Sequence, residues 1–230
     1  MRGPVPDSSL AIFDLDGTIT RRDTLWPYIR GYLRAHPGRW WRLAPCLLPL
    51  VRYALGSRDR GKLKGAIIRW TLGGLSRATL AAWSAEFTAR LLRTGLYAEA
   101  LTCIESLRRE STYLVLLSAS PDLYVPLIAR ALGFDDCVCT VLRWREDGTL
   151  DGTLASGNRR GPEKARYVRQ LLADRAPRLS RAFGNSDADL EHLRLVSVGC
   201  YVNGPARDLT DMPNVRAVTW RTRAQPLSAA

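Results

Sequence analysis

The sequence predicts an α/β fold in which a parallel sheet carries one inserted helical region. The apolar run Leu10–Phe13 is typical of a fully buried strand. From Leu96 onward, strand-like and helix-like segments alternate, which favours a parallel sheet with helices on both faces. Between Asp23 and Gly95 only helical patterns occur, although a βαβ unit needs only about 30 residues. We therefore expect this block to form a cap over the strand tips, where it would shield a site from water.

Composition and charge limit the classes of function. The chain has 230 residues, of which 46% are hydrophobic, so a substantial core is expected. Its net charge of +12 is compatible with phosphorylated metabolites, nucleic acid or an acidic membrane surface. Its five cysteines form no CxxC pair, which favours reduced core cysteines over a metal site. The first apolar run is followed by Asp14 and Asp16, so we see no secretory signal and expect a cytoplasmic protein.

The chain divides into a discontinuous core and a cap. We expect residues 8–22 and 96–220 to form the core and 23–95 to form the helical cap, with flexible termini at 1–7 and 221–230 because these ends are short and polar. Within the cap, Ser57 and Ser76 are candidate helix N-caps, and glycines end the helices that follow. The segment 40–55 is apolar but interrupted by arginine and proline, so it falls short of the ~20 apolar residues of a membrane span.

Several core elements can be placed from local patterns. A strand is expected at 112–117, and Pro121 should open the following helix, in which Pro126 would cause a bend. Residues 137–144 read as one strand that forms a hairpin with 150–155. A helix at 162–173 and a short helix at 187–193 alternate with strands at 180–183, 195–202 and 215–220.

The first candidate functional residues lie directly after the opening strand. Asp14 follows the strand directly, at the edge where open α/β sheets bind ligands. Asp16 lies on the same side if the chain stays extended. Gly17 permits a sharp turn, and Thr18 supplies a hydroxyl. Two carboxylates, a glycine and a hydroxyl at a strand tip suit a hard cation and a phosphate, although an ordinary turn has the same composition.

Three further polar clusters follow at strand ends or helix starts. Ser118 ends a strand, although a serine there is more often a helix cap. Lys164 lies in the first turn of a helix, where the macrodipole disfavours a cation; its position makes sense if an anion or carboxylate lies beside it. Asn185 and Asp189 flank a turn-like segment before a short helix. Each cluster is ordinary alone, but their order and placement together indicate one site.

With these residues in series, the chain resembles the haloacid dehalogenase (HAD) superfamily, and within it the phosphoserine-phosphatase-like branch, subfamily IB. Asp14-Leu-Asp-Gly-Thr is similar to the first family motif and Leu117-Ser-Ala-Ser to the second. Gly161-Pro-Glu-Lys is similar to the third, and Gly184-Asn-Ser-Asp-Ala-Asp to the fourth. The resemblance covers about residues 9–205 and implies a Rossmann-like HAD core with an inserted α-helical C1-type cap.

The resemblance implies an Mg²⁺-dependent phosphomonoester hydrolase. Asp14 would be the nucleophile that forms an aspartyl-phosphate, and Asp16 the general acid and base. Lys164 would neutralise the phosphoryl oxygens, and Ser118 would donate a hydrogen bond to one of them. The implied metal site comprises Asp14, Asp16 through its backbone carbonyl, Asn185 and Asp189. The implied substrate-binding residues are Asp23, Thr18 and Ala119.

Two positions qualify this assignment. The fourth motif of the family commonly begins Gly-Asp, but here the second residue is Asn185, which adds no negative charge. Asp189 would then take more of the metal coordination, and Asp187 is a further candidate. Asp23 lies where phosphoserine phosphatases recognise the substrate amine, which hints at an amino-bearing substrate, but it could equally cap a helix.

The leading hypothesis is therefore a phosphatase that acts on a small phosphorylated metabolite. Phosphoserine-like compounds are the candidate substrates of this kind. An alternative is a lysophosphatidate or other lipid phosphate phosphatase, with weak membrane-surface contact through the arginine- and tryptophan-rich cap segment 39–52. Against that contact stands the simpler interpretation of a packed cap helix. A second alternative is a basic, non-catalytic HAD-like binding module, although no nucleic-acid partner is expected.

Overall fold

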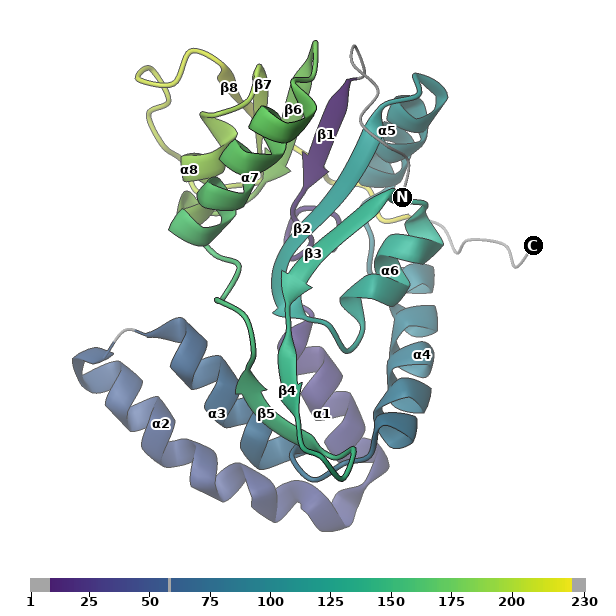
Figure 1. Cartoon of the computed structure of the whole chain (residues 1–230), viewed down its shortest axis with the longest axis vertical. Coiled ribbons are helices and arrows are strands. Elements are labelled where there is room, and N and C mark those ends of the chain that lie inside the picture. Colours follow the sequence, from purple (N-terminus) through teal and green to yellow (C-terminus); the bar gives the residue numbers. More distant parts are fainter. Residues whose placement is uncertain (1–8, 58, 225–230) are drawn as a thin grey trace.

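The computed structural model describes residues 9–57 and 59–224 and contains a six-stranded parallel sheet (Figure 1). The strand order is β3-β2-β1-β6-β7-β8, so the first strand of the chain lies inside the sheet and later strands are added on both sides of it. This confirms the predicted α/β class. The strands of the sheet are β1 (Leu10–Phe13), β2 (Tyr113–Pro121), β3 (Asp136–Thr140), β6 (Ser180–Gly184), β7 (Val198–Val202) and β8 (Val215–Val218).

Helices cover both faces of the sheet. Alternation along β1 divides its side chains between two apolar clusters: Ala11 and Phe13 belong to one, and Leu10 and Ile12 to the other. The first cluster includes residues of α5 and α6, and the second includes residues of α7 and α8. The covering helices are α5 (Ala98–Arg109), α6 (Val125–Leu132), α7 (Pro162–Arg175) and α8 (Asp187–Leu193).

The cap region is helical, as expected, and lies below the carboxyl ends of the strands in Figure 1. Its elements are α1 (Leu25–Ala35), the 3₁₀ helix η1 (Pro37–Cys46), α2 (Leu47–Arg52), the π-helical turn η2 (Tyr53–Ser57), α3 (Arg60–Leu72) and α4 (Arg77–Thr94). Ser76 caps α4 by accepting a hydrogen bond from the Thr79 N–H, as predicted. The predicted Ser57 cap is wrong, because the Asp59 side chain accepts from the Lys62 N–H and caps α3.

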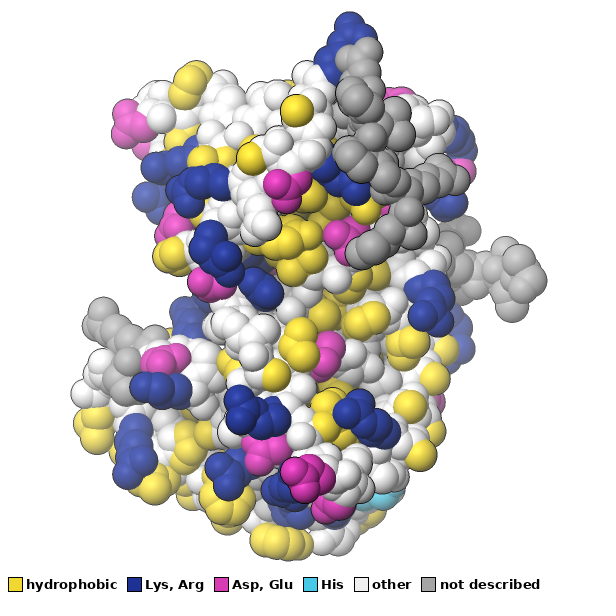
Figure 2. Space-filling view, viewed as in Figure 1, with side chains coloured by type: hydrophobic (Ala, Val, Ile, Leu, Met, Phe, Trp, Pro, Cys, Tyr) yellow, Lys and Arg dark blue, Asp and Glu magenta, His cyan; other side chains and the backbone are white. Residues whose placement is uncertain are grey.

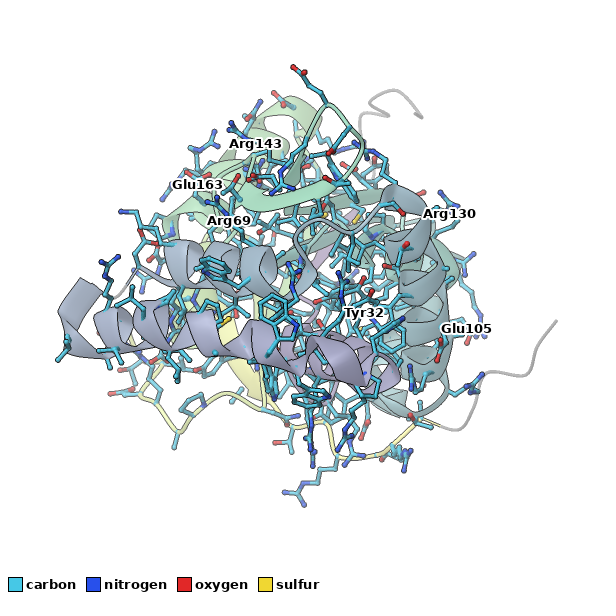
Figure 3. All side chains as sticks on the ribbon, turned by 90° about the horizontal axis from the view of Figure 1, so that it is seen from below. Tyr32, Arg69, Glu105, Arg130, Arg143 and Glu163 are labelled. Carbon is cyan, nitrogen blue, oxygen red and sulfur yellow. The ribbon has the colours of Figure 1, made fainter. Side chains whose placement is uncertain are left out.

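A hairpin from the second half of the chain joins the cap. The predicted strand 137–144 is divided between β3 in the sheet and β4 (Leu142–Trp144), which pairs with β5 (Leu150–Leu154) in a separate antiparallel ribbon. This ribbon packs against α3, and at Gly152 a β-carbon would lie 2.5 Å from the Arg69 Cα. Glycine at this position therefore permits the close approach. Figure 3 shows Arg69 on α3 beneath the hairpin.

The prolines after β2 occupy different positions from those predicted. Pro121 does not open a helix; it is the last residue of β2 and lies opposite Thr140 of β3. Helix α6 starts only at Val125, so Pro126 lies in its first turn rather than in its interior. A missing N–H is harmless in a first turn, which removes the reason for the predicted bend.

The chain is ordered beyond the predicted core boundary. The Glu99 carboxylate accepts hydrogen bonds from the backbone N–H groups of Arg221 and Thr222, each at 2.9 Å. The Ala224 N–H donates to the Leu96 carbonyl at 3.1 Å. The prediction of a flexible segment is therefore wrong for residues 221–224, whereas 1–7 and 225–230 lie outside the described residues. All five cysteines are free, and no helix in the described ranges is long and apolar enough to cross a bilayer.

Candidate active site

The candidate site lies at the carboxyl end of β1. Here the strand order reverses, because β1 is flanked by β2 on one side and β6 on the other. The Asp14 N–H donates to the Phe183 carbonyl at 2.9 Å, which continues the β1–β6 pairing to the strand tip. A pocket of about 440 Å³ opens there between the core and the cap, in the hollow region between the two lobes of Figure 2. Such a switch point is the usual ligand site of an open parallel sheet.

Lys164 joins two aspartates at the base of this pocket. Its ammonium donates to Asp14 Oδ1 at 2.5 Å and to Asp189 Oδ1 at 2.7 Å. The Lys164 and Asp14 residues are only 2% and 6% exposed. Although burial favours the neutral amine, the two carboxylates outweigh it and raise the pKa of Lys164 above its usual range. The sequence-based expectation of an anion beside this first-turn lysine is confirmed.

Burial raises the pKa of Asp14 to about 7, despite the opposing effect of the Lys164 ammonium, and the Asp189 and Asp16 carboxylates add to the rise. Thr18 is fully buried and its hydroxyl donates to Asp14 Oδ2 at 3.2 Å. The structure thus gives Thr18 a contact with the nucleophile candidate. A site with this excess of negative charge is suited to an added cation.

Asp189 has both carboxylate oxygens engaged. Its Oδ2 accepts from the Ser186 N–H at 3.0 Å and the Ser186 hydroxyl at 2.6 Å, which forms a capping box at the start of α8. Its Oδ1 accepts from Lys164. Asp189 therefore positions Lys164, and its part in metal coordination stays a prediction. Asp187 lies apart from the site and pairs with Arg207 at 3.2 Å.

The Asp16 side chain turns toward a hydroxyl cluster. It accepts from the Thr24 N–H at 2.7 Å, the Thr24 hydroxyl at 2.6 Å and the Ser120 hydroxyl at 2.5 Å. Thr24 also lies 3.0 Å from the Tyr124 hydroxyl. Burial raises the pKa of Asp16, as does the nearby Asp23 carboxylate. Sequence analysis missed Thr24, Ser120 and Tyr124, although Ser120 could have been found because it lies two residues beyond Ser118 on the same strand.

The second motif contributes Ser118 and Ala119 differently. Ser118 is fully buried, and its hydroxyl accepts from the Ser120 N–H at 3.0 Å. The helix-cap alternative for Ser118 is wrong because α6 begins seven residues later, at Val125. Ala119 lines the pocket. Contact of either residue with a phosphate stays a prediction.

Asn185 lies against the glycine of the first motif. A β-carbon on Gly17, whose φ is +79°, would lie 1.9 Å from Asn185 Nδ2. Among the described residues, no three His, Cys, Asp or Glu side chains form a metal-binding group. The expected ligands of a hard cation are the Asp14 carboxylate, the Asp16 carbonyl and the Asn185 amide oxygen, with Asp189 as a further one. These oxygen donors fit Mg²⁺.

The pocket has a cationic wall that sequence analysis missed, and the cap contributes Lys64 and Arg60 to it. Lys64 of α3 donates to the Ala119 carbonyl at 2.6 Å and to Asn158 Oδ1 at 2.8 Å. Burial lowers the pKa of Lys64 to about 8. Four arginines also line the pocket, namely Arg21, Arg22, Arg60 and Arg160. Asp23 lines it too, but its carboxylate accepts from the Leu25 and Trp26 N–H groups, as the helix-cap alternative predicted.

Residues 11–194 match the family of haloacid dehalogenase-like hydrolases. The matched range includes the strand-tip aspartates, the cap and the Lys164–Asp189 pair. The chain belongs to this family. It is 34% identical over 190 residues to Protein CicA of Caulobacter vibrioides, with 81% of this chain and 82% of that protein covered. The family resemblance inferred from the four motifs is thereby confirmed, and with it the assignment as a hydrolase.

Solved structures of other proteins have a fold similar to that of this HAD hydrolase. One of them is a protein of unknown function from Bordetella pertussis Tohama I. That structure has a TM-score of 0.77 at 22% identity, with 92% of this chain and 98% of the other covered. A phosphoserine phosphatase structure described as a phospho-aspartyl intermediate analogue has a TM-score of 0.64 at 14% identity, with 92% and 93% covered. These similarities confirm the Rossmann-like HAD fold.

Proposed function

We propose that this HAD hydrolase is an Mg²⁺-dependent phosphatase that acts through an aspartyl-phosphate on a small phosphorylated metabolite. The observation that carries the proposal is the buried Lys164 ammonium between Asp14 and Asp189. A carboxylate approaching a phosphate dianion is repelled, so a fixed cation beside the nucleophile lowers the barrier. A non-catalytic binding module would have no need of a buried charge cluster of this kind.

In the proposed reaction, an Asp14 oxygen attacks phosphorus as the bond from phosphorus to the leaving oxygen breaks. Asp16 gives its proton to that leaving oxygen, and the alcohol departs. Asp16 then takes a proton from a water molecule whose oxygen attacks phosphorus; the bond from phosphorus to the Asp14 oxygen breaks, inorganic phosphate leaves and the Asp14 carboxylate is regenerated. The raised pKa of Asp16 favours the protonated form needed first. Such an acid–base step contributes about 10²–10⁴-fold to the rate.

Mg²⁺, when bound by Asp14, the Asp16 carbonyl and Asn185, would offset the negative charge of the phosphate and the carboxylates. Lys164 would hold Asp14 ionised and contact the phosphoryl oxygens. Ser118 would donate to one of those oxygens, and the Ala119 backbone would border the phosphate. Asp189 would keep Lys164 aligned through their 2.7 Å hydrogen bond.

The cationic wall supports a polyanionic or phosphorylated small substrate. Lys64 and Arg60 come from the cap, Arg21 and Arg22 from the segment between β1 and α1, and Arg160 from the loop before α7. Asp23, at the pocket surface, would recognise an amino group, which supports the phosphoserine-like class. A lipid phosphate is the second candidate, because the outer side of the cap exposes apolar side chains.

The test is hydrolysis of an aryl phosphate by the purified chain with and without Mg²⁺. The Asp14→Asn variant should lose turnover, and the matched Asp187→Asn variant should retain it because Asp187 lies outside the site. A screen of phosphoserine, phosphoethanolamine, glycerol phosphate and lysophosphatidate then ranks substrates by kcat/KM. Turnover retained in Asp14→Asn would contradict the proposal.

A further inference from the structure

One side of the cap exposes an unusual concentration of large apolar side chains. Among the described residues, ten large hydrophobic side chains are strongly exposed, and seven of them lie between positions 40 and 55. The seven are Trp40, Trp41, Leu47, Leu48, Leu50, Val51 and Leu55, which we call the η1–α2 surface. Leu55 is 83% exposed and Trp41 is 68% exposed. Such a concentration of exposed apolar side chains marks an interaction site.

This surface belongs to an anchored segment. Arg42 fixes η1 to the end of α3, because its guanidinium donates to the Trp70 carbonyl at 2.7 Å and the Gly73 carbonyl at 2.6 Å. Cys46 is buried on the inner side. Helix α2, by contrast, has no buried residue. The packed-cap alternative considered from the sequence therefore fits the inner side of η1, whereas α2 contributes no buried residue.

The segment that carries this surface has positive charge only. From Thr24 to Arg58 the sequence contains no Asp or Glu, and its six arginines are Arg30, Arg34, Arg39, Arg42, Arg52 and Arg58. Arg30, Arg34 and Arg52 are exposed, and within the described ranges none of these three forms an ion pair. Figure 2 shows dark blue and yellow side chains together along the lower-left edge, where Figure 1 places α2. The complementary partner is apolar and anionic.

We propose that the η1–α2 surface binds an anionic lipid bilayer, with α2 lying in the plane of the interface. Aromatic and aliphatic side chains would enter the region between headgroups and acyl chains, and the arginines would contact lipid phosphates. Figure 3 shows the η1–α2 ribbon crossing the underside of the molecule, where a flat surface can reach it. A symmetric second copy fits less well, because a two-fold contact would bring the same arginines together.

This binding mode is independent of the phosphatase proposal, but it has a consequence for access to the pocket. The surface ends at η2, and α3 begins at Arg60, which lines the pocket. A bilayer on the η1–α2 surface would therefore lie on the same lobe that supplies Lys64 and Arg60 to the cationic wall. The bound protein would take its substrate from near the headgroup layer.

Co-sedimentation with vesicles tests the proposal. The purified chain should bind vesicles of phosphatidylcholine and phosphatidylglycerol, and bind pure phosphatidylcholine much more weakly. The triple variant Trp41→Ala/Leu48→Ser/Leu55→Ser should lower the partition coefficient at least tenfold. The matched control Trp26→Ala/Val141→Ser removes exposed apolar side chains elsewhere and should stay within twofold of the wild type.

A charge variant gives an independent measurement if the triple variant folds poorly by circular dichroism. Neutralising Arg34 and Arg52 to Gln should weaken binding about fivefold for each arginine, and raised salt should do the same to the wild type. The catalytically impaired Asp14→Asn protein should bind like the wild type, so failure of the phosphatase proposal would remain distinguishable. No binding of the wild type to anionic vesicles would overturn the proposal. So would equal binding by the triple variant, or a solution dimer that the triple variant dissociates in the absence of any vesicle binding.

Discussion

The Lys64 ammonium of the cap donates a 2.6 Å hydrogen bond to the Ala119 carbonyl of the core. The two residues are 55 positions apart in the sequence and both line the pocket. This hydrogen bond places a positive charge beside the loop that is expected to hold the substrate phosphate. Cap position and substrate affinity should therefore depend on the same side chain.

We expect Lys64→Met to lower kcat/KM for a phosphomonoester, mainly by raising KM. Loss of a hydrogen bond to a charged group typically costs about 1.5–3 kcal/mol, which corresponds to roughly 10- to 100-fold in affinity. The measurement is steady-state kinetics at pH 7. Lys62→Met is the matched control, since Lys62 is exposed on the same helix and forms a surface ion pair with Asp59. An unchanged KM for Lys64→Met would contradict this role.

The pH dependence of that affinity follows from the pKa of Lys64, which burial lowers to about 8. Below this pH Lys64 is protonated and attracts the anionic substrate. Above it the charge is lost, so KM should rise as the pH increases through about 8. A KM profile from pH 6 to 9.5 measures the effect, and Lys64→Arg should flatten the profile because arginine stays charged. A wild-type KM that is constant through this range would refute the assignment.

Replacement of Lys164 should affect both stability and activity. Lys164→Met leaves Asp14 and Asp189 buried without their shared counter-ion. Breaking a buried pair in this way typically costs about 3–5 kcal/mol of unfolding free energy. Urea denaturation and aryl phosphate hydrolysis measure the two effects. Arg166→Met, on the exposed side of the same helix, should change the unfolding free energy by less than about 0.5 kcal/mol; an equally small change in Lys164→Met would contradict the prediction.

The fourth motif predicts a tunable metal affinity. If Asn185 supplies an amide oxygen to Mg²⁺, Asn185→Asp should add a charged ligand and lower the Mg²⁺ concentration for half-maximal activity about tenfold, equivalent to about 1.4 kcal/mol. Asn185→Ala should raise it. Activity measured across an Mg²⁺ titration, after treatment with a chelator, gives both values. The Asp187→Asn variant is the control and should have the same half-maximal Mg²⁺ concentration as the wild type. If the wild type, Asn185→Asp and Asn185→Ala all had the same value, Asn185 would not be a metal ligand.

The parts of the site that sequence analysis predicted depend on local patterns. The apolar run that ends at Asp14 indicates the end of a strand, whatever position that strand takes in the sheet. A lysine in the first turn of a helix indicates a neighbouring anion. The paired strands β1 and β6 and the short helix α8 were found for the same reason. These features need only a few consecutive residues.

The parts that were missed depend on long-range packing. Lys64 and Asn158 meet across 94 positions of sequence, and no periodicity relates them. The run 137–144 has uniform strand character, so propensity could not indicate that β4 leaves the sheet to pair with β5. Residues 221–224 look like a polar tail, but the Glu99 carboxylate supplies acceptors for their N–H groups.

The β4–β5 ribbon also affects how caps could be exchanged between HAD hydrolases. Residues 23–95 would look like a self-contained cassette for grafting onto another core. In this chain, however, Gly152 packs on Arg69, and the Leu150 N–H donates to the Leu75 carbonyl at 2.8 Å. A chimera that transfers the helices alone would separate these partners. The smallest transferable unit therefore consists of two segments, the helices and the ribbon that supports them.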